Sequence, residues 1–381
     1  MTRRGRSVPA LVAIVLMGGL SSAPTAAATT TCHEPHSSPA DAGVQDNWIT
    51  DIAHLSACNV WEVGQWSDGP GPKADQPYVA HGLAEHWNGA AWHQVPVPQV
   101  GAPDNNVFLR GVSAVKPYDM WAVGRVNDNV HDATLAMHWD GHGWTHVVTP
   151  SPGAEATLAA VAVHTHDDAW AVGTWTGASR RGGLVERWNG QRWTVQSKTT
   201  NAELADVVTA RGGRSWAVGN ITSHHERHGL VLHWTGKRWK RQATSLLPAG
   251  TDLVSVAASG RHNVWAVGQA DGDAHDLALH FHGNRWHRVR VPSLDADSNV
   301  LDAVSVDAKD GAVWAAADDE INGVGYAHVF VRRNGAWSDV ACLPDQPSRL
   351  LSIEAARRGK AVAAGFLIDG TDSHLLSRTC A

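Results

Sequence analysis

Short apolar segments recur along the chain in a fixed order, separated by polar turns. Each repeat opens with a segment such as LRGVSAV (109–115) or LADVVTA (204–210), and a turn leads to a second segment that begins with Trp and ends with Gly. A polar loop then leads to a third segment, and a tight turn to a fourth. The segments are rich in β-branched residues and Trp, and none shows a sustained helical period. This pattern predicts β-strands, four in each repeat.

The Trp that opens the second segment marks the repeat. It stands at positions 61, 121, 170, 216, 265 and 314, and Val362 takes its place in a seventh repeat. The intervals are 60, 49, 46, 49, 49 and 48 residues. Repeats of this length with four strands are typical of propeller blades. We therefore expect an all-β protein, with a single seven-bladed β-propeller of four-stranded antiparallel blades in residues 29–381.

The third and fourth segments meet at a turn between two Trp residues, as in WNGAAW (87–92), WDGHGW (139–144), WNGQRW (188–193) and WTGKRW (234–239). Asn-Gly and Asp-Gly supply the positive φ angles that a tight hairpin requires. With these hairpins and the WAVG motif, the chain resembles secreted bacterial β-propellers in the neighbourhood of the kelch and galactose-oxidase-like propellers. The Gly-Gly doublet of kelch repeats is absent, so the resemblance implies the architecture and not membership of the kelch family.

A closed ring of blades explains the repeated Trp and Gly. Blades that pack face to face bury both sides of each sheet, and we expect sixteen of the nineteen Trp residues to lie between blades. Trp48, Trp66 and Trp175 fall outside this pattern. The Gly at the end of the motif is expected to allow a close backbone approach or a bulge.

The seventh repeat ends after its third segment, SHLLSRTCA (373–381). We expect residues 29–38 to supply the missing fourth strand and to close the ring.

Four cysteines in an exported chain predict two disulfides. Cys58 and Cys380 are assigned to one end of the blades, and Cys32 and Cys342 to the other. The pairs favoured on this ground are Cys58–Cys380 and Cys32–Cys342, and the alternative is Cys32–Cys380 with Cys58–Cys342.

Residues 1–28 have the features of an export signal. Arg3, Arg4 and Arg6 precede the apolar run ALVAIVLMGGL (10–20), and small residues surround the expected cleavage after Ala28. No later apolar run reaches the roughly 18 residues of a membrane span. Removing the three Arg residues changes the formal charge from −6 to −9. An acidic chain without runs of Lys or Arg argues against nucleic acid and membranes as partners. We expect a secreted, extracellular monomer.

The residue directly after the Trp–Gly motif is polar in six of the seven repeats. Since these residues end a strand, we expect them to line one mouth of the central channel, with Trp66 and Trp175 beside them either as stacking platforms or packed against a neighbouring blade. The candidate ligand-binding ring is Gln65, Trp66, Arg125, Thr174, Trp175, Asn220, Gln269 and Asp318, with Phe366 in the seventh slot. Neutral hydrogen-bonding groups with one Arg and one Asp suit a glycan or a peptide backbone.

No motif points to a catalytic, metal or cofactor site. There is no G-x-S-x-G elbow, the Asp-rich loop VNDNVHD (126–132) lacks EF-hand spacing, and SHHERH (223–228) is not H-E-x-x-H. The leading hypothesis is therefore a secreted, non-catalytic binding module for a glycan or an extracellular protein. The alternative is an extracellular carbohydrate-active hydrolase or lyase, with acids such as Asp206 and Asp318 at the channel mouth.

Overall fold

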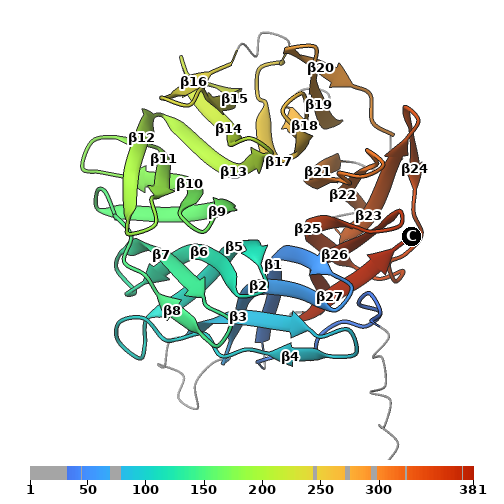
Figure 1. The fold of residues 1–381 in the computed structure, drawn as a ribbon, viewed down its shortest axis with the longest axis horizontal. Coiled ribbons are helices and arrows are strands. Elements are labelled where there is room, and N and C mark those ends of the chain that lie inside the picture. The colour runs from blue at the N-terminus through green and yellow to red at the C-terminus, as the bar shows by residue number, and fades with distance from the viewer. Residues whose placement is uncertain are drawn as a thin grey trace, which may run out of the picture. The chain divides into compact units, whose positions relative to one another are not determined.

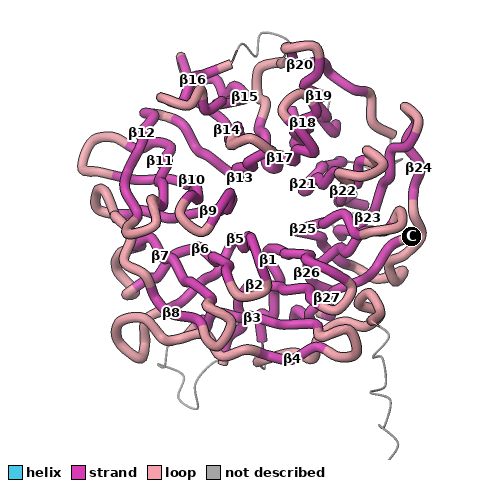
Figure 2. Tube along the Cα trace, in the orientation of Figure 1, coloured by secondary structure: helices cyan, strands magenta, loops and turns pink. Residues whose placement is uncertain are grey.

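The computed structural model consists of antiparallel β-sheets arranged around a common centre (Figures 1 and 2). It describes residues 32–43, 45–68, 79–242, 247–270, 275–292, 298–321, 324–370 and 372–381. Within these ranges the chain forms 27 strands in seven sheets, and no helix is long and apolar enough to span a membrane. The all-β, seven-bladed prediction is thus confirmed. The expected signal peptide, residues 1–28, lies outside the described residues.

Each blade takes its strands from one continuous stretch of the chain, in sequence order. The strands are β1 (Gln45–Ser56), β2 (Asn59–Ser67), β3 (Ala80–Trp87) and β4 (Trp92–Gln94); β5 (Asn106–Lys116), β6 (Asp119–Asn127), β7 (Asp132–Trp139) and β8 (Trp144–His146); β9 (Glu155–Thr165), β10 (Asp168–Thr176), β11 (Arg181–Trp188) and β12 (Trp193–Thr200); β13 (Ala202–Ala210), β14 (Arg214–Ser223), β15 (Glu226–Trp234) and β16 (Trp239–Arg241); β17 (Asp252–Gly260), β18 (Asn263–Ala270), β19 (His275–His282) and β20 (Arg285–Val289); β21 (Ser298–Val306), β22 (Val313–Ile321), β23 (Val324–Arg333) and β24 (Ala336–Asp339); and β25 (Ser348–Ala356), β26 (Lys360–Asp369) and β27 (Asp372–Cys380).

The Trp of each WAVG-type motif packs between two blades. Trp170 of blade three is 1 % exposed, and its ring centroid lies 4.7 Å from Trp234 and 5.0 Å from Trp239 of blade four. Blades one and two contact the next blade through the same three-Trp arrangement. An indole buried in this way removes a large apolar area from water and stabilises the blade interface.

The Gly that ends the motif faces a bulge in the first strand. Gly219 pairs with Leu204, and the register shifts by one residue between Leu204 and Asp206. A Cβ atom on Gly219 would overlap the carbonyl oxygen of Glu203. The corresponding Gly of five other blades meets a carbonyl oxygen in the same way, which confirms the predicted close approach; the sixth blade has Ala317 at this slot.

The last blade has three strands, in the order β25-β26-β27. The segment that precedes β1 follows the free edge of β27, but its described residues form no strand. Side chains make most of the contacts instead: Thr379 Oγ1 donates to the Pro35 carbonyl, Ser377 N to Ser38 Oγ at 3.2 Å, and Leu375 N to Asp41 Oδ1 at 2.9 Å. The N-terminal segment therefore lies where a fourth strand was expected, without the ladder of one.

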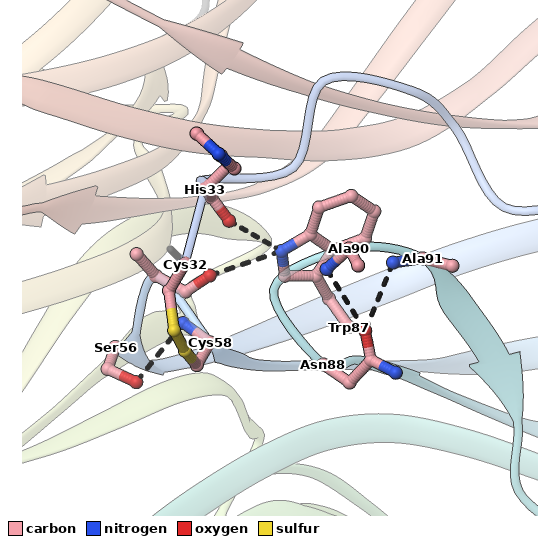
Figure 3. Close-up of a disulfide and its surroundings, with 9 residues drawn as sticks. Cys32, His33, Ser56, Cys58, Trp87, Asn88, Ala90 and Ala91 are labelled. Atoms are coloured by element: carbon pink, nitrogen blue, oxygen red, sulfur yellow. Dashed lines mark hydrogen bonds between the residues drawn. A yellow bond between two sulfur atoms is a disulfide. The ribbon is translucent and has the colours of Figure 1, made fainter. Parts of the chain in front are cut away.

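The disulfides join Cys32 to Cys58 and Cys342 to Cys380, with Cα atoms 5.1 and 5.2 Å apart. Both predicted pairings are therefore wrong. Figure 3 shows the first disulfide beside Trp87, whose Nε1 donates to the carbonyl oxygens of His33 at 2.7 Å and Ala57 at 3.2 Å.

The pairing error has two physical causes. Because the N-terminal segment runs antiparallel to β27, its first residue, Cys32, lies at the end of the ring that holds the Cys58 turn. Cys380 stands at the position of β27 that corresponds to Trp139 in β7. Trp139 contacts Trp61 of the blade that precedes its own. The Cys380 side chain thus points toward blade six, where Cys342 lies. The direction of the N-terminal segment thus accounts for the first pair, and the direction of the Cys380 side chain for the second.

Candidate ligand-binding site

A central cavity of about 370 Å³ runs between the blades, and the first strand of every blade lines it. Each of these strands pairs with only one neighbour, so its other edge faces the cavity. The wall thus combines strand edges with side chains from seven blades.

Polar side chains in this wall join neighbouring blades across the ring. An oxygen of one blade accepts the backbone N–H of the next: Asp51 from Val112 at 2.7 Å, Ser113 from Val163 at 3.1 Å, Asp206 from Val256 at 2.8 Å, Ser255 from Val304 at 3.2 Å, and Ser305 from Ala355 at 2.9 Å. Ser352 Oγ of the last blade donates to Asp51 Oδ1 of the first at 2.8 Å, so bonds of this kind join neighbouring blades from the first to the third and from the fourth back to the first. These bonds satisfy groups that β-ladders leave unpaired.

Three carboxyl groups of the wall are shifted toward the protonated form. Loss of solvation raises the pKa of Asp51 to about 6 and the pKa values of Asp206 and Glu354 to about 7. Repulsion from Asp51 adds to the rise for the other two. The cavity therefore holds acids that titrate near neutral pH.

Sequence reasoning named Asp206 and overlooked Asp51 and Glu354. The signal was present, because the first segments ITDIAHL (49–55) and LLSIEAA (350–356) carry an acid where most repeats have a small or apolar residue. Arg110 was also overlooked; its exposed side chain lines the same cavity from the bulge position of β5.

The predicted ring residues lie at one end of the blades. In each blade the residue after the motif pairs with a residue of the first strand. The pairs include Gln65 with Trp48, Arg125 with Phe108, and Asn220 with Glu203. None of the eight belongs to the described lining of the central cavity. We call this end, from Gln65 round to Phe366, the channel mouth.

Several residues of the channel mouth are held by neighbours in their own or the next blade. Asn220 Nδ2 donates to Asp252 Oδ1 of blade five at 2.9 Å, and Arg349 Nε of blade seven donates to Asp318 Oδ2 at 2.7 Å. Arg125 binds Asp132 at 3.0 Å, and Thr174 Oγ1 lies 3.0 Å from Thr157 Oγ1. These side chains are placed by the fold before any ligand arrives.

Gln65 and Gln269 differ from the others. Both are half-buried, and neither side-chain amide forms a hydrogen bond with another described residue. Within the part of the chain that the structure describes, their donors and acceptors have no side-chain partner.

The two extra Trp residues pack against their own blades. The indole of Trp66 stacks on the His81 ring, with centroids 4.3 Å apart, and Lys198 Nζ lies 4.3 Å from the centroid of Trp175. Trp175 Nε1 is buried without a hydrogen-bond partner in the described chain.

Asp206 and Asp318 have separate structural partners. Asp206 accepts N–H groups of Val207 and Val256, whereas Asp318 binds Arg349. Within the described ranges, no three His, Cys, Asp or Glu side chains are grouped so that they could hold a metal ion.

The chain folds as a seven-bladed β-propeller, and the predicted ring residues lie together at one end of its blades. No protein-family model matches the chain, and no curated protein sequence matches it either. Three solved structures are similar to it: YCF48 bound to a D1 peptide (TM-score 0.55, 14% identity, 92% of this chain and 100% of that chain), U3-55K (0.53, 10%, 87% and 95%) and a protein from Lactobacillus plantarum (0.53, 11%, 84% and 96%). At this level of identity the similarity shows the fold alone.

Proposed function

We propose that the protein is an exported, monomeric, non-catalytic binding module that recognises a peptide segment of an extracellular protein at the channel mouth. The observation that carries the proposal is the pair of side-chain amides, Gln65 and Gln269, that form no hydrogen bond with another described residue, on a rim where other polar groups are already oriented. A peptide backbone presents alternating donors and acceptors that match amide side chains. The hydroxyl groups of a glycan are the second ligand chemistry that such a rim suits.

Two further facts support a peptide. Charged and aromatic groups share the rim: the Arg125 guanidinium lies 4.4 Å from the Phe108 ring centroid, and Trp48 stacks on Phe366 at 5.4 Å. The similar propeller YCF48 was solved with a peptide bound. Two disulfides and the apolar, Arg-headed N-terminus favour function outside the cytoplasm.

The test is binding to peptide and glycan arrays, followed by calorimetry on the best ligands. The double variant Gln65→Ala/Gln269→Ala removes no hydrogen bond between described side chains, so it should keep its fold and bind about tenfold more weakly. The matched control, Gln191→Ala/Gln196→Ala on the outer part of blade three, should bind like the parent. Unchanged affinity of the first variant would contradict the proposed site.

A carbohydrate-active enzyme is the second candidate, because the raised pKa of Glu354 suits a general acid near neutral pH. Among the described residues, Glu354 Oε2 accepts a hydrogen bond from the Ser305 hydroxyl alone, at 2.9 Å. Release of reducing ends from polysaccharides by the parent, lost in Glu354→Gln, would favour this alternative over the binding module.

A further inference from the structure

Exposed cations crowd the end of blades four and five that lies opposite the channel mouth. This end is formed by the turns between first and second strands and by the hairpins between third and fourth strands; β14, for example, runs from Arg214 here to Asn220 at the channel mouth. We call the following nine exposed residues the basic end: Arg211, Arg214, Lys237, Arg238, Lys240, Arg241, Arg261, Arg285 and Arg288. No Asp or Glu stands in the four turns that carry them.

The nine cations have no counter-ion among the described residues. None of them forms an ion pair, a side-chain hydrogen bond or a ring contact with another described residue. Some Arg residues of other blades do have a carboxylate partner, as in Arg125–Asp132 and Arg187–Asp168. Unpaired charges of one sign create a field that attracts ligands of the other sign.

The positive charge of the basic end affects the pKa of a neighbouring histidine. Burial lowers the pKa of His233, and Arg214 lowers it further. At the other end of the same blades the charges are largely acidic, with Glu203, Glu226 and Asp252. The net charge of −6 for the whole chain therefore conceals two ends of opposite character.

We propose that the basic end binds a linear polyanion with a charge on each repeat, such as an anionic polysaccharide. The cations stand in four turns and in the adjoining parts of β14, β16 and β20, in two adjacent blades, which suits many weak contacts along a chain. The large apolar side chains that are exposed in the described structure lie in other blades. The described residues of the basic end thus offer no apolar anchor for a membrane, and one exposed ring there, His282, is already stacked on His287.

The experiment measures binding of dextran sulfate and of unsulfated dextran by calorimetry at about 50 mM and about 200 mM salt. The parent should bind only the sulfated polymer, and more weakly at the higher salt. The double variant Lys237→Gln/Arg238→Gln should bind about tenfold more weakly at low salt, with a shallower salt dependence. All four side chains changed in this variant and its control are exposed, so both proteins should stay folded.

The matched control is Arg180→Gln/Arg181→Gln, which removes the same charge from a hairpin at the other end of blade three and should bind like the parent. Equal weakening in both variants, or equal binding of unsulfated dextran, would overturn the proposal. Tighter binding of duplex DNA or of anionic vesicles, compared at equal charge concentration, would also overturn it and assign the surface to that partner. These outcomes are independent of the peptide test, which alters residues at the channel mouth.

Discussion

The imidazole of His280 lies flat on the indole of Trp265, with ring centroids 4.2 Å apart and an interplanar angle of 13°. Asn263 Oδ1 lies 3.1 Å from Trp265 Nε1 and 2.8 Å from His280 Nε2, and accepts a hydrogen bond from each. Blade one repeats the arrangement around Asn59. His280 and its counterpart His86 are thus structural groups, and burial lowers the pKa of His280 to about 4.

The shared acceptor makes Asn263 the residue to change. Asn263→Ala leaves the buried indole N–H and the imidazole N–H without a partner, so we expect the free energy of unfolding to fall by about 2–4 kcal/mol. Urea denaturation followed by Trp fluorescence measures the change. His262→Ala alters an exposed residue of the same turn and should be nearly neutral; a similar loss in both variants would refute the role of the shared oxygen.

The motif Gly is required by space. Gly219→Ala places a methyl group on the carbonyl oxygen of Glu203, and the shift needed to relieve the clash should lower the free energy of unfolding by about 1–3 kcal/mol. Gly143→Ala is the control, because a Cβ there meets no atom within 4 Å. Thermal unfolding should separate the two variants, and equal melting temperatures would be inconsistent with the bulge as described.

The cavity carboxyl groups predict a stability that depends on pH. Burial raises the pKa of Glu354 from 4.5 to about 7, so between these values the folded state holds a proton that the unfolded state has released. Its favourable contribution is therefore complete below about pH 4.5 and declines as the pH rises to about 7. Asp51 and Asp206 act in the same direction.

Glu354→Gln cannot ionise and should lose less thermal stability than the parent between about pH 5 and about pH 8. The lowered pKa of His280 acts in the opposite sense, but it is common to both proteins and cancels in the comparison. Glu320→Gln, at an exposed position of β22, should follow the parent. Parallel pH profiles for Glu354→Gln and the parent would show that this carboxyl group is not protonated in the folded state.

The disulfide pattern can be read chemically. Peptide mapping of the unreduced protein should recover the pairs Cys32–Cys58 and Cys342–Cys380, 26 and 38 residues apart. Replacing either pair by Ser should lower the free energy of unfolding by about 3–4 kcal/mol, because loops of this length constrain the unfolded chain. Recovery of a peptide that links the first blade to the last would contradict the structure.

The repeat made the ring predictable because it fixes strand number, strand order and the spacing of the Trp residues. The role of the motif Gly also followed from position, since only a close backbone explains Gly at one slot in six repeats. The hydrogen-bond and disulfide partners of particular side chains could not be predicted from the repeat. The partners of Asp51 and Cys380 depend on which neighbouring blade each side chain faces, and strand periodicity leaves that choice open. The net charge of the chain, likewise, does not show that basic and acidic residues lie at opposite ends of blades four and five.

Each disulfide joins parts of the chain that are close in sequence, so neither one links the first blade covalently to the last. Either disulfide can therefore form before the ring closes. Cys32–Cys58 requires the first blade and the N-terminal segment, and Cys342–Cys380 requires the last two blades. The junction between the chain's two extremities is left to reversible contacts such as Ser352 with Asp51. The ring can therefore open between the first and last blades without reduction of either disulfide.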